Sequence, residues 1–132
     1  DHFSYSFKEQ KTLASKIYCI DNGLRNAVSF KFSEDEGKLA ENLVLIELKR
    51  REKEPYYWRN KHEVDFVIKN KDQSLTAINV SYTDEVNERE VDGLLEFKKE
   101  FKKIKELIVL TKDLEKIENR IKYIPIWKWL LE

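Results

Sequence analysis

The sequence predicts an α/β domain in which helices flank a mixed central sheet. Short apolar runs rich in strand-forming residues alternate with longer stretches whose apolar residues recur at helical spacing, and this order is typical of that class. The chain has 132 residues, of which 41% are hydrophobic, with seven Phe, six Tyr and three Trp. A chain of this length fits one domain, and its apolar content can fill a core without disulfides.

The N-terminal quarter divides into an arm and the first elements of the domain. Residues 1–15 lack periodicity, so we expect an N-terminal arm or a linker from an upstream region, with the domain itself covering residues 16–132. Residues 16–21 predict a strand, and residues 24–28 a helical turn. The lone cysteine, Cys19, lies in this apolar run, which indicates a small buried side chain in a reducing, cytoplasmic compartment.

Residues 33–52 predict the first long helix. Ser33 and Glu36 have the spacing of a capping box, in which the first residue caps the helix and the acid bonds back to it. A broad apolar arc follows, with Glu47 inside it and Glu41 at its edge. For Glu47 we favour a buried, hydrogen-bonded structural acid over a site residue. Glu41 fits a surface acid and a site residue equally well.

The rest of the chain predicts a meander, a helix and a closing strand. Three short runs at 55–59, 63–68 and 75–82 are separated by tight turns, as in adjacent antiparallel strands. The remaining elements are a helix at 88–103 capped by Asn87 with Glu90 in the capping-box position, a strand at 107–110, a charged connection at 112–120, an extended piece at 122–125 and a terminal turn or helix at 126–131.

Two-residue periodicity places polar side chains together on neighbouring strands. We expect Asp65 to face Asn79 and Ser81 across the strand pair, with Glu41 reaching the same edge from the preceding helix. On the strand at 63–68, one predicted face carries Val64, Phe66 and Ile68, and the other carries Glu63, Asp65 and Val67. On the strand at 75–82, one predicted face carries Ile78, Val80 and Tyr82, and the other carries Ala77, Asn79 and Ser81.

The segments at 37–42, 63–67 and 78–81 resemble the three site motifs of PD-(D/E)xK, or restriction-endonuclease-like, nucleases. The first is similar to the helix motif of archaeal Holliday-junction resolvases. The resemblance implies a helix–meander–helix–strand core and a catalytic site at Glu41, Asp65, Asn79 and Ser81. It also implies a weakly held Mg²⁺ at Glu41 and Asp65 and possible contact with DNA.

Nearly the whole chain is also similar to nuclease-like C-terminal domains of uncharacterised, largely archaeal, AAA+-type ATPases. The similarity lies in the runs 16–24, 41–48, 56–58, 63–66 and 124–131. It implies an upstream ATPase domain in the same polypeptide as a partner. This chain carries no ATP-binding G-x-x-x-x-G-K-[ST] loop, because its glycines are Gly23, Gly37 and Gly93 alone and Leu39 follows Lys38.

The sequence departs from the nuclease pattern on the third meander strand. The family has a carboxylate or amide and a Lys there, whereas this chain has Asn79 and Ser81. Because Ser81 cannot supply the positive charge, we expect a degraded site and a non-catalytic module that binds DNA or a partner or regulates the ATPase. The alternatives are an active Mg²⁺-dependent endodeoxyribonuclease with a relocated cation (Lys61, Lys69 or Arg59), or a purely structural or oligomerisation domain.

Charge and composition exclude several other classes. The net charge is +0, so any nucleic-acid contact must come from local patches rather than from an excess of positive charge. No apolar run is long enough to span a membrane, and one cysteine with two histidines argues against a zinc site. Homo-oligomerisation stays open. The lysines at 98–105 with residues 49–51 could form a phosphate surface, although a solvated helix face is the better interpretation. For Trp127 and Trp129 we favour packing over base stacking.

Overall fold

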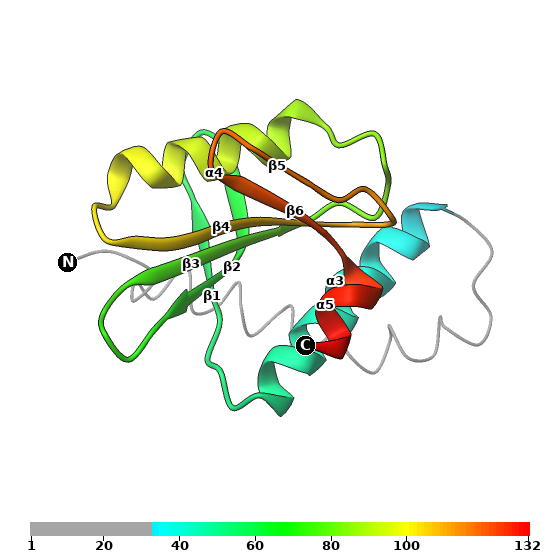
Figure 1. Ribbon diagram of the computed structural model, residues 1–132, viewed down its shortest axis with the longest axis horizontal. Helices are drawn as coiled ribbons and strands as arrows, with labels where there is room; N and C mark the ends of the chain where they lie inside the picture. The colour runs from blue at the N-terminus through cyan, green and yellow to red at the C-terminus, as the bar shows by residue number, and fades with distance from the viewer. Residues whose placement is uncertain (1–32) are drawn as a thin grey trace.

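The computed structural model describes residues 33–132, with side chains from residue 36 onward. The predictions for the arm at 1–15, the strand at 16–21, the turn at 24–28 and Cys19 lie outside the described residues. The described part is a mixed α/β fold, which confirms the predicted class (Figure 1).

Six strands form one sheet in the order β1-β2-β3-β4-β6-β5. β1, β2 and β3 are antiparallel neighbours, as the meander predicts, whereas β4 runs parallel to β3 and to β6, and β5 pairs antiparallel with β6. The strands are β1 (Tyr56–Arg59), β2 (Glu63–Lys69), β3 (Leu75–Val80), β4 (Ile104–Thr111), β5 (Lys116–Glu118) and β6 (Ile121–Pro125).

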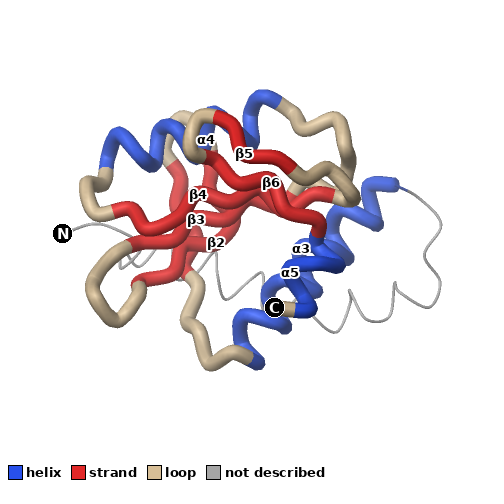
Figure 2. Tube along the Cα trace, viewed as in Figure 1, coloured by secondary structure: helices blue, strands red, loops and turns tan. Residues whose placement is uncertain are grey.

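Helices cover both faces of this sheet. Helix α4 (Glu88–Glu100) lies on one face, and helices α3 (Ser33–Arg50) and α5 (Ile126–Leu131) lie side by side on the other (Figure 2). The lysines of α4 and the basic end of α3 are therefore on opposite sides of the sheet and do not form one phosphate-binding surface. Within residues 33–132, no helix is long and apolar enough to cross a membrane.

Each face of the sheet has its own hydrophobic core. On the α4 side, Leu94 and Phe97 pack on Val67 and Val109, with Trp58 edge-on to Phe97 at 5.3 Å between ring centroids. On the other side, the apolar arc of α3 and the terminal helix pack on the opposite face of the same strands. That second core contains Ala40, Val44, Leu45, Leu48, Phe66, Ile68, Ile78, Ile108, Leu110, Ile126 and Trp129.

The strand faces predicted for β2 need one correction. Val64 packs with Val67 on the α4 side, whereas Phe66 and Ile68 pack on the α3 side, so Val64 and Phe66 do not share a face. The register with β1 shifts at this point, because Tyr56 pairs with Val67 but Trp58 pairs with Val64. Two residues of β2, Asp65 and Phe66, thus lie opposite one residue of β1, Tyr57, as in a β-bulge, and the alternation of faces reverses there.

Both long helices end earlier than the apolar pattern predicts. α3 stops at Arg50 because Glu52 takes a positive φ of 60°, and the Glu52 and Lys53 N–H groups bond back to the carbonyls of Lys49 and Leu48, as in a Schellman motif. α4 stops at Glu100, since Phe101 is extended. Asn87 caps α4 as predicted, its side chain accepting from the Arg89 N–H at 2.8 Å.

Two further differences concern the C-terminal strands. β4 runs from Ile104 to Thr111, three residues earlier than the apolar run at 107–110 indicates. The charged segment at 112–120 contains a strand, β5, which pairs with β6 through a turn in which Asn119 and Arg120 both have positive φ. Such a turn suits a two-residue hairpin, but β5 is exposed throughout and so has no apolar pattern to reveal it.

Candidate functional site

The regular pairing of β2 with β3 ends one step before Asp65. The last paired residues are Phe66 and Ile78, and beyond them side chains replace the backbone ladder. The Asp65 N–H donates to Asn79 Oδ1 at 2.7 Å, and the Val80 N–H donates to Asp65 Oδ2 at 2.9 Å. The strands therefore separate at this edge while their backbone groups stay bonded, as buried polar groups must.

Asn79 joins three segments of the chain. Its side chain is fully buried and faces α4. The amide nitrogen donates to the carbonyls of Glu63 at 3.2 Å and Glu90 at 2.8 Å, while the amide oxygen accepts from Asp65. A buried amide that is bonded at both ends to backbone is placed to hold the start of β2, the end of β3 and the first turns of α4 together.

Gly93 allows this close contact between helix and strand. A Cβ atom at this position would lie 2.2 Å from the carbonyl oxygen of Glu63 and 3.3 Å from the amide nitrogen of Asn79. The first of these separations is far below any real contact, so only a residue without a side chain permits the observed approach. Gly93 thus brings Glu90, one turn earlier in α4, close to Asp65.

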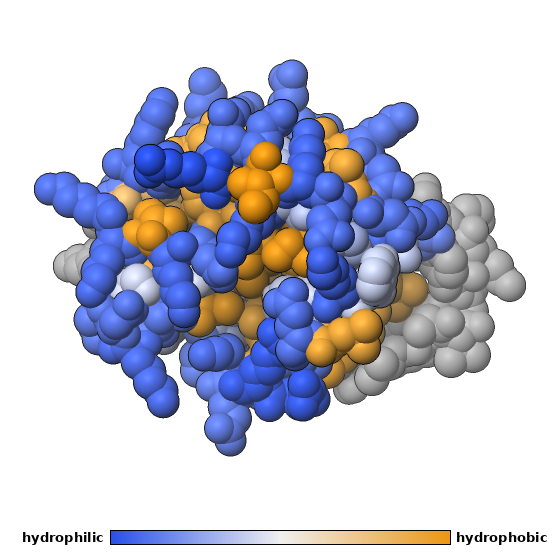
Figure 3. All heavy atoms as spheres, in the orientation of Figure 1, coloured by the Kyte–Doolittle hydropathy of each residue, from blue (hydrophilic) through white to orange (hydrophobic). Residues whose placement is uncertain are grey.

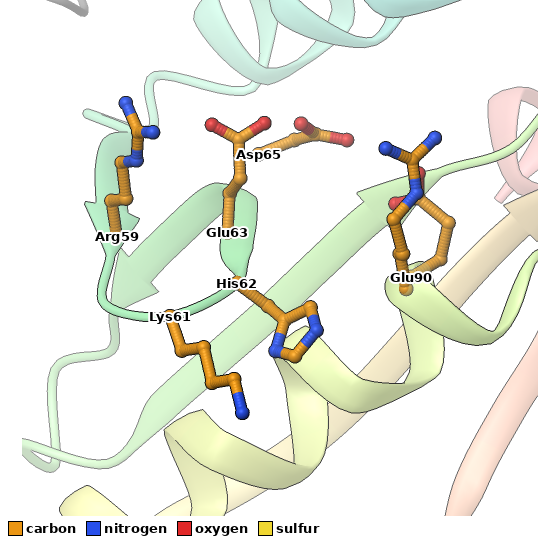
Figure 4. A pocket seen from close by; sticks show the side chains of 7 residues that line it. Arg59, Lys61, His62, Glu63, Asp65 and Glu90 are labelled. Carbon is orange, nitrogen blue, oxygen red and sulfur yellow. The ribbon is translucent and has the colours of Figure 1, made fainter.

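A polar pocket of about 320 Å³ opens at this place, between the β1–β2 turn and the N-terminal end of α4. In Figure 4 the carboxylates of Glu63 and Asp65 lie at a similar height above the strand with Arg59 beyond Glu63, whereas the Lys61 side chain points away from both. The described residues that line the pocket are Arg59, Lys61, His62, Glu63, Asp65, Arg89 and Glu90.

Glu90 is electrostatically unusual. Burial, together with the negative charges of Asp65, Glu41 and Glu63, raises the pKa of its carboxyl to about 7, and Arg89 only partly opposes this. Asp65 on β2 and Glu41 on α3 therefore act on the same carboxyl. Glu41 and Asp65, the two acids that the sequence predicts to converge, therefore both lie close enough to Glu90 to raise its pKa.

The turn that carries the basic residues is fixed to α4. The His62 N–H donates to Glu96 Oε1 at 2.9 Å, and His62 Nδ1 contacts the other oxygen of the same carboxylate. Burial acts to raise the pKa of Glu96, but these hydrogen bonds from His62 outweigh it and hold that pKa below its ordinary value. Arg59 and Lys61 precede His62 in this turn, and both line the pocket.

The four predicted site residues lie in different surroundings. Asp65 lines the pocket, Glu41 acts on it electrostatically, and Asn79 is buried behind it. Ser81 lies just past β3, where its N–H donates to the carbonyl of Leu110. Of the three basic residues considered as relocated cations, Arg59 and Lys61 line the pocket, whereas Lys69 lies at the closed end of the β2–β3 hairpin, paired with Leu75.

Sequence reasoning missed the contribution of three residues. Glu63 was assigned to the same strand face as Asp65 but given no role, and Glu90 was read only as half of a capping box. Arg89 received no assignment. A signal for Arg89 and Glu90 was present in the sequence, because both follow Asn87, the residue that caps α4. A helix that begins soon after β3 has its N-terminus at the sheet edge where β3 ends, and this is the edge where Asp65 lies.

The pocket was also tested as a metal site. In the part of the chain that the structure describes, no three His, Cys, Asp or Glu side chains come together closely enough to hold a metal ion. The carboxylates of Glu63, Asp65 and Glu90 line one pocket without forming such a set. Among the described residues there is thus no ready-made set of three such ligands, and the weak Mg²⁺ expected at Glu41 and Asp65, which would rest on two carboxylates and water, stays a prediction.

Fold and pocket together define a mixed α/β domain with a charged pocket where two antiparallel strands separate. Comparison with known proteins gives the family: a model described as "Domain of unknown function (DUF4143)" matches residues 36–129, and the chain belongs to this family.

Two curated relatives match most of the chain. It is 32% identical over 142 residues to the Uncharacterized protein MJ1544 of Methanocaldococcus jannaschii, covering 97% of this chain and 32% of that protein. It is also 32% identical over 120 residues to an uncharacterised protein of Haemophilus influenzae, covering 89% of this chain and 29% of that protein. The chain thus spans about a third of the length of these relatives. No solved structure matches it.

Proposed function

We propose that this chain is a nuclease-derived module that binds the phosphate backbone of DNA without cutting it, as part of a longer ATPase polypeptide. The order α3-β1-β2-β3-α4-β4, with three antiparallel strands and a fourth parallel to the third, supports a restriction-endonuclease-like core. It is the helix–meander–helix–strand order that the sequence resemblance implies.

The observation that carries the proposal is the composition of the pocket. Arg59, Lys61 and Arg89 line it together with Asp65. Arg and Lys are the side chains that most often contact phosphate oxygens in complexes with nucleic acids. When Glu90 is protonated, the described lining residues carry three positive groups against the two carboxylates of Glu63 and Asp65, and this small positive excess supports contact with an anion.

Two features argue for binding without cutting. Ser81 cannot provide the positive charge that the nuclease pattern has at its position, and the fully buried amide of Asn79 is engaged by backbone. Loss of one charge-stabilising group in such a site costs roughly 10²–10³ in rate.

A second candidate function is an active Mg²⁺-dependent endodeoxyribonuclease. It is favoured by one observation, the presence of Arg59 and Lys61 in the same pocket as Asp65, where either could serve as the relocated cation. This candidate requires the acids to gather around a metal on binding, which the described arrangement does not yet provide.

The link to an ATPase rests on length and on motif content. The chain covers about a third of each relative, which leaves room for a further domain, and it has no phosphate-binding loop of its own. We propose, as the sequence resemblance implies, that an upstream ATPase domain in the same polypeptide is the natural partner of this module.

The test is DNA binding by the 132-residue chain, followed by fluorescence anisotropy with duplex, single-stranded and branched oligonucleotides over a range of salt. We expect salt-sensitive binding, with the double variant Arg59→Ala/Lys61→Ala weaker and its log–log salt slope reduced by roughly 1 per side chain removed. The matched control is Lys98→Ala/Lys99→Ala, which removes the same charge from the solvent face of α4. Binding that is lost in the control and kept in the pocket variant would contradict the proposal.

The same mixtures with Mg²⁺ or Mn²⁺ separate the two candidates. Intact DNA supports the binding module. Cleavage that disappears in Asp65→Ala and in Arg59→Ala/Lys61→Ala establishes the nuclease with a relocated cation instead. Neither binding nor cleavage, together with self-association in sedimentation, would leave the structural or oligomerisation role.

A further inference from the structure

An apolar groove of about 380 Å³ lies between α3 and α5, on the side of the sheet opposite α4. Its apolar walls are Leu39, Leu43, Tyr82, Ile126, Trp127 and Leu130. The polar pocket beside Asp65 shares none of these residues, so the groove is a separate feature of the surface.

Large apolar side chains are exposed around this groove. Trp127 is 54% exposed and Leu43 is 46% exposed, and Tyr82 is also exposed. Apolar side chains reach the surface in several places on the face shown in Figure 3, one of them in the region of α5. Contiguous exposed apolar surface of this kind marks an interaction site, because leaving it in water costs free energy.

The position of the groove indicates which segment covers it. The groove is lined by the first three turns of α3, which begins at Ser33, directly after residues 24–32. Nine residues can extend about 30 Å, whereas the stretch of α3 from Ser33 to Leu43 is roughly 15 Å long, so the segment can reach every part of the groove. A tether this short also gives a high effective concentration.

The composition of that segment matches an apolar groove. Residues 24–32 contain Leu24, Ala27, Val28, Phe30 and Phe32, and two of the nine residues carry a charge. The match to the Methanocaldococcus jannaschii protein covers 97% of this chain and so extends into its first 32 residues. The segment thus accompanies the domain in a relative.

We propose that residues 24–32 of this chain dock in the α3–α5 groove and cover Leu43 and Trp127. The groove is then an intramolecular interface that joins the segment leading into the domain to its C-terminal helix. The proposal does not depend on DNA binding, and neither result bears on the other.

Trp127 provides a direct test. Trp58 and Trp129, the other two tryptophans, are buried, so acrylamide quenching of the intact chain reports mainly on Trp127. We expect Phe30→Asp to raise the Stern–Volmer slope and to shift the emission to the red, because the charge displaces the segment. The matched control is Phe7→Asp, which makes the same change outside the segment. Equal quenching in the two variants would overturn the proposal, as would quenching that falls with protein concentration but is unaffected by Phe30→Asp, since a second copy would then cover the groove.

A crosslink keeps the test independent of whether Phe30→Asp folds. In a Cys19→Ser background, we expect Phe30→Cys and Leu43→Cys to form an intramolecular disulfide on mild oxidation. The control pairs Phe30→Cys with Lys99→Cys, an exposed position on the opposite side of the sheet. Preferential closure of the groove pair supports docking, and equal or slower closure than in the control contradicts it.

Discussion

The amide oxygen of Asn79 accepts a hydrogen bond from the backbone N–H of Asp65 at 2.7 Å, at the point where β2 and β3 cease to pair. The same amide donates to the carbonyls of Glu63 and Glu90. One buried side chain therefore sets the distance between the strand acid of the pocket and the helix that carries Glu90. The nuclease resemblance assigns Asn79 to the catalytic site, but in this structure its side chain holds the backbone around the pocket in place.

Asn79→Ala is expected to destabilise the fold by about 2–4 kcal/mol, because it removes three hydrogen bonds that one fully buried side chain makes to the backbone of Asp65, Glu63 and Glu90. Urea unfolding followed by circular dichroism measures this loss. Asn60→Ala, at an exposed position in the β1–β2 turn, is the control and should change the unfolding free energy little. A loss below about 1 kcal/mol for Asn79→Ala would mean that these hydrogen bonds are readily replaced by water.

Gly93→Ala is expected to destabilise the fold, by about 1–3 kcal/mol, because the added Cβ meets the Glu63 carbonyl at 2.2 Å and must push α4 away from β2. The chain offers a matched control in Gly37→Ala, since Gly37 lies inside α3 and a Cβ there has nothing within 4 Å. That change should instead stabilise by about 0.5–1 kcal/mol through helix propensity. Thermal unfolding of both variants compares them directly, and shifts of the same sign would contradict this account of Gly93.

The sequence was sufficient for the class of fold because the core is periodic. Most apolar residues in the arc of α3, the stripe of α4 and the strand runs are buried as their spacing predicts, although Leu43 is exposed and Leu45, which the predicted arc does not include, is buried. The sequence was insufficient for features that leave no mark in the hydrophobic pattern. The bulge in β2 separates Val64 from Phe66 without any Gly or Pro to mark it, and the exposed β5 has no apolar side to detect.

The residues of the pocket likewise divide into those that the sequence could predict and those that it could not. Asp65 could be singled out because an acid alternates there with buried apolar residues. Glu90 could not, because its role depends on how closely α4 approaches β2. That distance is set by Gly93, one turn further along α4, and by Asn79 on β3, and their contacts with β2 exist only in the assembled fold.

Glu47 is a buried, hydrogen-bonded structural acid, as its place inside the apolar arc of α3 predicts. Its buried carboxylate accepts hydrogen bonds from Arg50 at 2.6 and 2.9 Å and from Arg51 at 2.6 Å. Arg51 in turn bonds the Trp129 carbonyl at 2.8 Å and stacks on the Trp129 ring. Glu47 thus positions the arginine that holds α5 against α3.

Glu47→Gln should lower the melting temperature in a pH-dependent way. The hydrogen bonds from Arg50, and then those from Arg51, lower the pKa of Glu47 from 4.5 to about 2. A lowered pKa in the folded state gives stability that is present above about pH 4.5 and disappears as the pH falls to about 2. Melting curves of both proteins should therefore differ at neutral pH and converge near pH 2, with the exposed Glu54→Gln as control. A constant difference at every pH would show that the carboxylate's charge is not what matters.

Glu90→Gln should stabilise the protein above neutral pH. Burial, then the charges of Asp65 and Glu41, raise the pKa of Glu90 from 4.5 to about 7, so the folded state holds a proton that the unfolded state has released between these values. Stability of the native protein therefore falls as the pH rises from about 4.5 to 7 and is level above that. Gln imitates the protonated acid, so the variant should match the native protein at pH 4 and exceed it by on the order of 3 kcal/mol at pH 8.

The measurement is the free energy of unfolding in urea at intervals from pH 4 to pH 8. Glu88→Gln, exposed in the same first turn of α4, removes an equal charge near the helix N-terminus and should not show the gain. Because Asp65 contributes to the raised pKa, Asp65→Asn should also reduce the pH dependence, which links the two acids in one pocket. Equal pH profiles for Glu90→Gln and the native chain would show that Asp65 and Glu90 do not interact electrostatically in this pocket.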